Sequence, residues 1–183
     1  MKRLMMILGL LAIITGCTTC ENRDVAKAIK VEKEVKHVVR ITYYIHQSEP
    51  FNVGQENYYP MPDAIREPWR EATGRIQDAV DGRIEFVEVN SPLSADILLC
   101  FTDTHPSTLA YWDKLNGILA VNRMANHGNV MQTLLHETLH ACGIGHSGDC
   151  NCIMYFNASG GIGVPIITKK LRDKLLKILD GRR

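Results

Sequence analysis

The sequence predicts an α+β fold: a mixed sheet of mostly four to five strands, a long helix and a C-terminal helix. The expected order of elements is strand, helix, four strands, helix, helix, and runs of strands between helices favour α+β over a doubly wound sheet. The chain has 183 residues and is 45% hydrophobic. This suits one globular domain of about 150 residues with a single core.

Five segments have the composition of strands. Residues 37–47 are rich in β-branched and aromatic residues, and residues 83–90 alternate between apolar and polar positions, as a half-buried strand does. Residues 95–101 form a continuous apolar run typical of a central strand. Residues 107–113 and 117–123 are two further candidates joined by a tight connection.

Three segments have helical spacing. Residues 48–62 read as a turn-rich connection to the first helix, which has Pro68 in its first turn and some helical structure from near Asp63. Asn129 is expected to cap the second helix, and the third runs over residues 168–179. The expected core positions are Trp69, Ala72, Ile76 and Val80, then Met131, Leu135, Leu139 and Cys142, then Leu171, Leu175 and Ile178.

The N-terminus has the pattern of an export signal. Lys2 and Arg3 precede an apolar run over residues 4–14, which is too short to span a bilayer. The run ends Ile-Thr-Gly-Cys, which resembles the lipobox of bacterial lipoproteins, in which the cysteine is lipidated after cleavage. The alternative is an ordinary cleaved signal peptide with a cysteine nearby.

The resemblance implies a signal peptide over residues 1–16, lipid attachment at Cys17 and a tether over 17–36, and the remaining domain covers 37–183. We therefore expect an exported protein, anchored to the cell envelope through its N-terminal lipid and facing the periplasm or the outside. The net charge of +1 comes from scattered basic residues, so nucleic acid is not an expected partner.

Five cysteines remain after Cys17, and export permits disulfides. Because five is odd, at least one thiol stays free or pairs outside the chain. Cys150 and Cys152 are too close for an easy mutual bond, and connectivity with Cys142 or Cys100 stays open.

Three histidines and a glutamate lie within eleven residues of the second helix and the turn after it. His136 and His140 are four residues apart, so they share one helix face and can bind one metal ion. Gly143 can end the helix and redirect the chain, which lets His146 return as a third ligand. Three imidazoles leave the fourth position of zinc open, as catalytic sites require.

Glu137 follows the first ligand and lies beside the expected open position. It is suited to act as the general base for a metal-activated water that attacks a peptide carbonyl. The alternative is that the short histidine pattern occurs by chance, with histidines that flank a helix and have no function. The longer pattern adds Gly143 and His146. From the composition of this chain, a chance match to it is about 0.003 times as frequent as a chance match to the short pattern.

The longer pattern resembles the signature of the metzincin zinc peptidases, whose downstream methionine lies in a tight turn below the ligands. Met154 is the matching residue. Ser147 and the interval to Met154 are most similar to the matrixin, or matrix-metalloprotease, type. The resemblance implies one catalytic zinc and a peptide substrate paired with an edge strand near Leu109 and Ala110.

Some residues depart from the matrixin pattern. The loop after the third strand carries His105, Asp103 and Asp113, which do not amount to a second zinc site, and calcium is possible but not supported by the sequence. Archaemetzincins compete as relatives, because they also place a cysteine two residues before the methionine, as Cys152 stands here. They add cysteines that this chain lacks, so we prefer a disulfide or a free thiol for Cys150 and Cys152.

The favoured function is therefore a zinc-dependent endopeptidase, expected to be a monomer. The alternatives are a non-catalytic, zinc-stabilised surface lipoprotein and a protein-binding module. Other polar and aromatic residues carry no function at this point: His37 and His46 are expected at the surface, and the Tyr58–Tyr59 pair is expected in packing or a loop.

Overall fold

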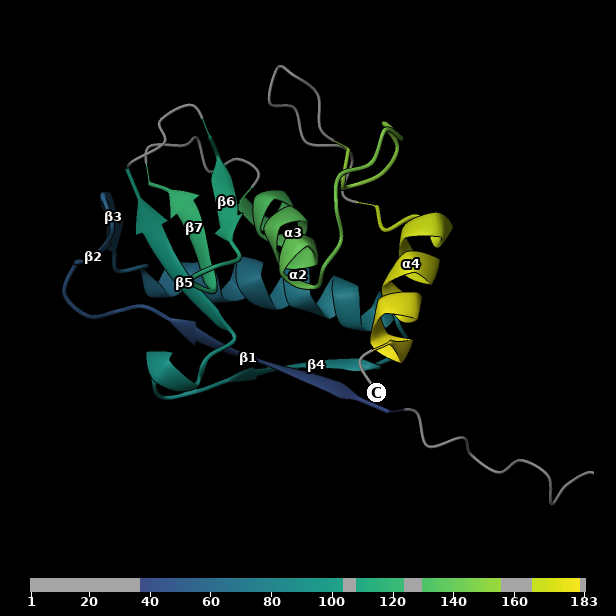
Figure 1. The fold of residues 1–183 in the computed structure, drawn as a ribbon, viewed down its shortest axis with the longest axis horizontal. Coiled ribbons are helices and arrows are strands. Elements are labelled where there is room, and N and C mark those ends of the chain that lie inside the picture. Colours follow the sequence, from purple (N-terminus) through teal and green to yellow (C-terminus); the bar gives the residue numbers. More distant parts are fainter. Residues whose placement is uncertain (1–36, 104–107, 124–129, 156–165, 182–183) are drawn as a thin grey trace, which may run out of the picture. The chain divides into compact units, whose positions relative to one another are not determined.

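A computed structural model of the chain describes residues 37–103, 108–123, 130–155 and 166–181. These residues form an α+β domain around one mixed sheet, as the sequence predicts (Figure 1). The strands are β1 (Val39–Ile45), β2 (Phe51–Val53), β3 (Glu56–Tyr59), β4 (Ile84–Glu88), β5 (Ile97–Thr102), β6 (Ala110–Asp113) and β7 (Ile118–Asn122). The helices are η1 (Asp63–Ile65), α2 (Arg66–Ala79), η2 (Pro92–Ser94), α3 (Val130–Ala141) and α4 (Lys169–Asp180).

Strand β5 organises the sheet. It pairs in parallel with β1 and β7 and antiparallel with β3. Strand β4 extends the sheet beyond β1 in parallel, and β6 extends it beyond β7 antiparallel. All five predicted strands are present, and the apolar run that the sequence placed at the centre is the central strand.

The sheet has seven strands rather than four to five, because residues 48–62 are more than a connection. They contain the hairpin of β2 and β3, which turns at Gly54, where φ is +62°. Pairing with β5 at Tyr58↔Thr102 and Tyr59↔Phe101 holds this hairpin in the sheet. Pairing with β5, more than 40 residues away, therefore stabilises a hairpin that the local sequence, rich in turn-forming residues, does not predict.

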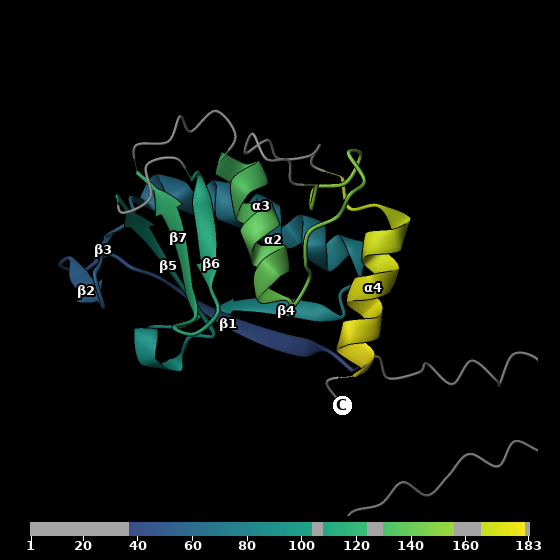
Figure 2. The same cartoon turned by 45° about the horizontal axis from the view of Figure 1, so that its top comes forward.

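The main core lies between one face of the sheet and helices α2 and α3 (Figures 1 and 2). Alternation along each strand sends every second side chain into it, such as Ile41, Leu99 and Leu119. The expected core positions of α2 and the predicted helical turn from Asp63 are confirmed. In α3, Leu135, Leu139 and Cys142 are buried, and Met131 packs against them while partly buried.

Helix α4 lies at the opposite end of the domain from the β2–β3 hairpin (Figure 2). Thr168 caps it by accepting a hydrogen bond from the Leu171 amide. Leu171, Leu175 and Leu179 are buried, whereas the predicted core residue Ile178 is only partly buried, so the apolar face is centred one position further on.

The other face of the sheet carries a smaller cluster, with Tyr58, Cys100, Ile118 and Ala120 buried. No described helix has the length and apolarity needed to cross a lipid bilayer. The predicted signal peptide, Cys17 and the tether lie outside the described residues, as do Asn129 and His105. The domain boundaries over residues 1–36 therefore stay predictions.

Candidate metal centre

The end of α3 brings the three histidines together. Beyond Ala141 the Gly143 amide donates to the His140 carbonyl and the Ile144 amide to the Leu139 carbonyl, each at 2.9 Å. This is the Schellman arrangement that closes many helices, and it requires a left-handed residue. Gly143 supplies that residue with φ of +95°. The chain then turns back along the helix, as the sequence predicts, and carries His146 toward the other two rings.

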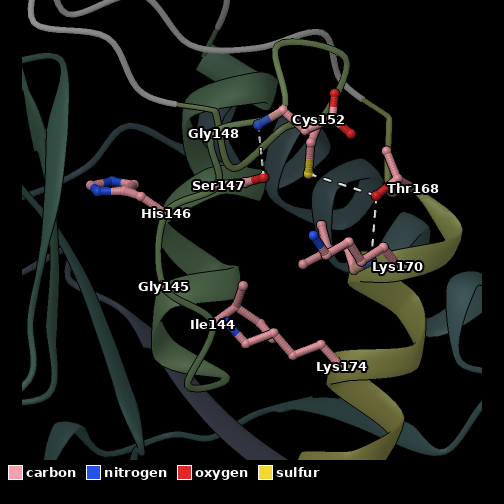
Figure 3. A pocket seen from close by; sticks show the side chains of 11 residues that line it. Ile144, Gly145, His146, Ser147, Gly148, Cys152, Thr168, Lys170 and Lys174 are labelled. Atoms are coloured by element: carbon pink, nitrogen blue, oxygen red, sulfur yellow. Dashed lines mark hydrogen bonds between the residues drawn. The ribbon is translucent and has the colours of Figure 1, made fainter.

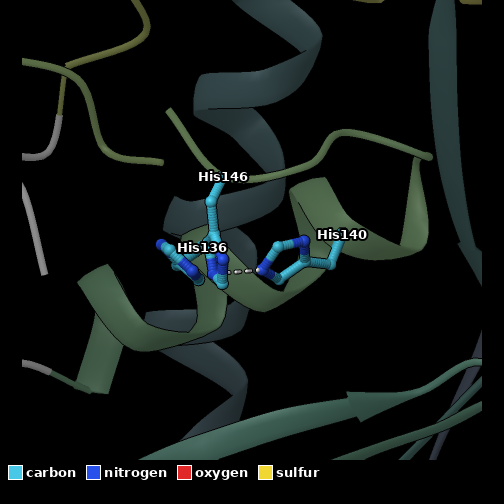
Figure 4. Close-up of side chains that lie close together, drawn as sticks. All are labelled: His136, His140 and His146. Atoms are coloured by element: carbon cyan, nitrogen blue, oxygen red, sulfur yellow. Dashed lines mark hydrogen bonds between the residues drawn. The ribbon is translucent and has the colours of Figure 1, made fainter. Parts of the chain in front are cut away.

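The three imidazoles face one common point (Figure 4). Their centroids are 4.7 to 5.3 Å apart, and one candidate ligand atom from each lies within 4.8 Å of the others. The Nε2 atoms of His140 and His146 are 3.1 Å apart. Two nitrogens bound to tetrahedral zinc at the usual bond length are separated by about 3.3 Å. The donor set and the separation of this pair therefore fit zinc binding.

Backbone carbonyls fix the tautomers of two rings. His136 Nδ1 donates to the Ile153 carbonyl at 2.8 Å, and His140 Nδ1 donates to the Ile144 carbonyl at 2.7 Å. With the proton held at Nδ1, each ring keeps an Nε2 lone pair toward the common point. Such outer hydrogen bonds are what orients histidine ligands in metal sites.

Met154, the residue that matches the methionine of the predicted turn, is fully buried in the main core. The Ser147 amide donates to the Met154 carbonyl at 2.8 Å, and Ser147 forms an isolated bridge with Tyr155. The residue after His146 is thus bonded to the methionine itself. Because Ile153, the next residue back, accepts from His136, one short turn fixes the position of two ligands.

Glu137 is 8% exposed and lies one residue past the first histidine. Burial raises the pKa of its carboxyl to about 8, and the nearby Trp112 backbone amide opposes this rise. Trp112 belongs to β6, so the carboxyl lies close to the edge strand. The described residues supply no cationic partner for this buried carboxyl. Such a group is unusual in a core and typical of an active site.

Two of the histidine rings, those of His136 and His140, favour the neutral form. Burial lowers the pKa of His136 to about 4, and burial also lowers the pKa of His140, each opposed by its bond to a backbone carbonyl. Neutral imidazole is the form that binds metal. The two inner ligands therefore need no deprotonation above about pH 6.5.

Strand β6 is an edge of the sheet within the described residues, since it pairs with β7 alone. The Leu109 carbonyl accepts from the Asn122 amide at 2.9 Å and so points toward β7. By the alternation of an antiparallel ladder, the backbone groups of Ala110 and Trp112 point away from β7. Of the two residues expected to bind substrate, Ala110 thus offers outward groups and the Leu109 carbonyl is already bonded.

The cysteines hold no disulfide among the described residues, where the thiols of Cys100 and Cys152 are buried and that of Cys150 is exposed. The histidine triad is also the one group of metal-ligating side chains in the described part of the chain. His46, expected at the surface, is instead buried, with its Nε2 atom 3.0 Å from the Glu49 carbonyl oxygen.

A cavity of about 240 Å³ lies between the 144–149 loop and α4, with Lys170 and Lys174 in its wall. The ring of His146 points away from this cavity (Figure 3). It is therefore separate from the metal cluster, although the two share a loop.

The Trp112 amide is the site group that the sequence analysis missed, because a backbone donor leaves no mark in the residue pattern.

Comparison of the sequence with protein-family models gives no match, and neither does comparison with curated proteins. Among solved structures, the archaemetzincin from Methanopyrus kandleri is similar, with a TM-score of 0.48 and 14% identity, over 80% of this chain and 98% of that chain. The roles considered below come from the geometry of this chain's own side chains.

Proposed function

We propose that the protein is a zinc-dependent endopeptidase of the metzincin type. The observation that carries the proposal is the convergence of three imidazoles next to a buried carboxyl, that of Glu137. Three protein ligands leave zinc a free position, whereas structural zinc sites are closed by a fourth. Within the described residues no fourth ligand joins the triad.

His136, His140 and His146 would hold the ion. A zinc ion held in this way supplies Lewis-acid polarisation of the substrate carbonyl and makes water acidic enough to attack near neutral pH. Glu137 then takes a proton from the attacking water and passes it to the leaving nitrogen. The Trp112 amide keeps that carboxyl turned toward the edge strand.

Substrate binding by strand addition to β6 is part of the proposal. The outward backbone groups of Ala110 are available for it, and they precede the Trp112 amide that holds the general base. An extended peptide on this edge would therefore run past Glu137. A complex with a peptide that runs elsewhere would contradict this part of the proposal.

The matrixin-like subtype rests on Ser147 and on the interval to Met154. The different environments of Cys150 and Cys152, one exposed and one 2% exposed, favour this subtype over a second zinc site of the archaemetzincin kind. Zinc analysis of the loaded wild type and of Cys152→Ala tests for a second ion at these cysteines. One equivalent in both proteins agrees with a single site, and a second equivalent that is lost in Cys152→Ala contradicts it.

The test of function compares Glu137→Gln with the wild type and with Glu71→Gln, an exposed helix carboxylate that pairs with Arg75. Each protein is loaded with one equivalent of zinc and assayed for digestion of casein and gelatin. We expect the Glu137 variant to bind zinc as the wild type does and to lose at least 100-fold in rate, because its amide cannot accept the proton. Equal rates in all three proteins would eliminate the peptidase assignment.

We also propose that the domain is lipid-anchored through Cys17. This rests on the sequence pattern of residues 1–17. Labelling of the full chain with a palmitate analogue, in the wild type and in Cys17→Ala, tests it. Equal labelling of the two proteins would contradict the anchor.

A further inference from the structure

Strand β6 needs a restraint that the sheet alone does not supply. It has four residues and one pairing partner, and an exposed turn follows it, in which Leu115 is 95% exposed. Short edge strands are the parts of a sheet that open most easily. Yet β6 provides the amide that holds Glu137.

The restraint comes from the outer face of the sheet. The Tyr111 hydroxyl of β6 donates to the Glu56 carboxylate of β3, and the Tyr58 hydroxyl donates to the same carboxylate. The two hydroxyl oxygens are 3.1 Å apart. We call these three side chains the outer-face cluster.

The outer-face cluster spans the sheet. Strands β3 and β6 are not neighbours, because β3 pairs with β5, β5 with β7, and β7 with β6. The bond from Tyr111 to Glu56 therefore joins the edge strand to a strand three positions away. The cluster covers the fully buried side chains of Cys100 and Ala120, so these bonds are made over an apolar surface.

The chemistry of the cluster makes it a firm anchor. Hydrogen bonds to an ionised acceptor are stronger than neutral ones, and exclusion of water strengthens them further. Burial, followed by the bond to Glu56, raises the pKa of Tyr111, and the pKa of Tyr58 is raised for the same reasons. Both hydroxyls therefore keep their protons, and remain hydrogen-bond donors, at neutral pH and well above it.

The anchor reaches the metal centre through one peptide. Tyr111 and Trp112 are adjacent, and they point to opposite faces of the sheet: Tyr111 joins the outer-face cluster, and Trp112 packs against the main core. The alternation of the ladder points the Trp112 amide away from β7, and this amide lies close enough to the Glu137 carboxyl to lower its pKa. A shift of β6 would therefore move the backbone group that faces the carboxyl.

From this continuity we infer that Glu56 and Tyr111 are positioning residues for the general base. They fix the edge strand from the outer face of the sheet, and the strand fixes Glu137 through the Trp112 amide. The inference rests on the proposed function for its catalytic part. Small displacements of a catalytic group cost large factors in rate, so such an anchor has a kinetic effect.

The test compares Tyr111→Phe with Tyr58→Phe in the zinc-loaded protein. Each variant removes one hydroxyl from the same carboxylate and keeps the ring, but only Tyr111 lies on β6. Two measurements are made: hydrogen exchange at the Trp112 amide by NMR, and kcat and KM for casein digestion. Glu56→Gln, which keeps an acceptor oxygen, and Glu56→Ala, which does not, complete the set.

We expect Tyr111→Phe and Glu56→Ala to speed exchange at Trp112 about tenfold and to lower kcat about tenfold, with zinc affinity unchanged. Tyr58→Phe should change both by less than about twofold, and Glu56→Gln should recover most of the loss. Equal effects of the two tyrosine variants would show a general loss of stability and overturn the inference. Unchanged exchange in Tyr111→Phe would overturn it as well.

The exchange measurement separates this inference from the proposed function. A wild-type protein without peptidase activity would refute the function and, with it, the catalytic part of the inference. Faster exchange in Tyr111→Phe would then still support the anchor, and unchanged exchange would overturn it. Faster exchange with an unchanged kcat in an active enzyme would overturn the positioning role alone.

Discussion

The metal-free protein should lose stability between pH 7 and 8.5 because of one carboxyl. Glu137 is 8% exposed, and its pKa is raised to about 8 by burial. In the unfolded chain the same group has a pKa of about 4.3. Above pH 7 the unfolded state has lost this proton while most folded molecules keep it, so unfolding releases a proton and becomes easier as the pH rises.

The magnitude follows from the linkage relation. With a folded pKa of about 8, stability falls by about 1.2 kcal/mol between pH 7 and pH 8.5. His136 and His140 act in the opposite direction, because their pKa values are lowered, but their contribution is gained at lower pH, mainly below about 6.5. Above pH 7 the glutamate is therefore the largest of these contributions. The buried Cys100 thiol, whose pKa is also raised by burial, adds a smaller loss in the same direction, and comparison with a Glu137 variant cancels it.

Urea unfolding in the presence of a chelator, at pH 7.0 and pH 8.5, measures the effect. Glu137→Gln is the matched variant, because its amide has the same shape and no titration. The wild type should lose about 1.2 kcal/mol more than the variant over this interval. Equal losses in the two proteins would refute the assignment of a raised pKa to this carboxyl and the desolvation argument behind it.

Three further predictions concern stability. Met154→Ala should cost about 2–5 kcal/mol in urea unfolding, because the side chain is fully buried, and a loss below about 1 kcal/mol would contradict its full burial in the core. Gly117→Ala should cost about 1–2 kcal/mol by thermal unfolding, since φ is +67° and a Cβ would lie 3.1 Å from the Asp96 carbonyl oxygen, and any gain in stability would contradict this. Arg172→Ala should cost less than about 1 kcal/mol despite its 2.8 Å ion pair with Asp81, because about half of each side chain is exposed to water, and a larger loss in urea unfolding would show that the pair has a structural role.

The metal cluster could be predicted because its information is local. His136, His140 and Gly143 act through helical periodicity and one left-handed residue, both of which are visible in the letters. The apolar run of β5 was equally clear. Each of these features depends on residues that are close in sequence. Contacts with distant parts of the chain therefore did not change the conformation that the local sequence predicts.

The missing parts depend on distant partners. The hairpin of β2 and β3 is stabilised by pairing with β5, and the Gly and Asn residues around it read only as turn formers. Tyr58 was expected in packing, but its hydroxyl shares a carboxylate with Tyr111, 53 residues away. No sequence spacing encodes such a meeting, because it follows from the order of strands in the sheet.

The turn from Ser147 to Met154 is closed at its base by main-chain bonds, which leaves its tip independent of the metal ligands. The tip carries Cys150, whose thiol is exposed, whereas the thiols of Cys100 and Cys152 are buried. A maleimide dye should therefore react first at Cys150 among these three. A spectroscopic reporter could in this way be placed four residues from His146 without disturbing the ring itself, and ion uptake could be followed in real time.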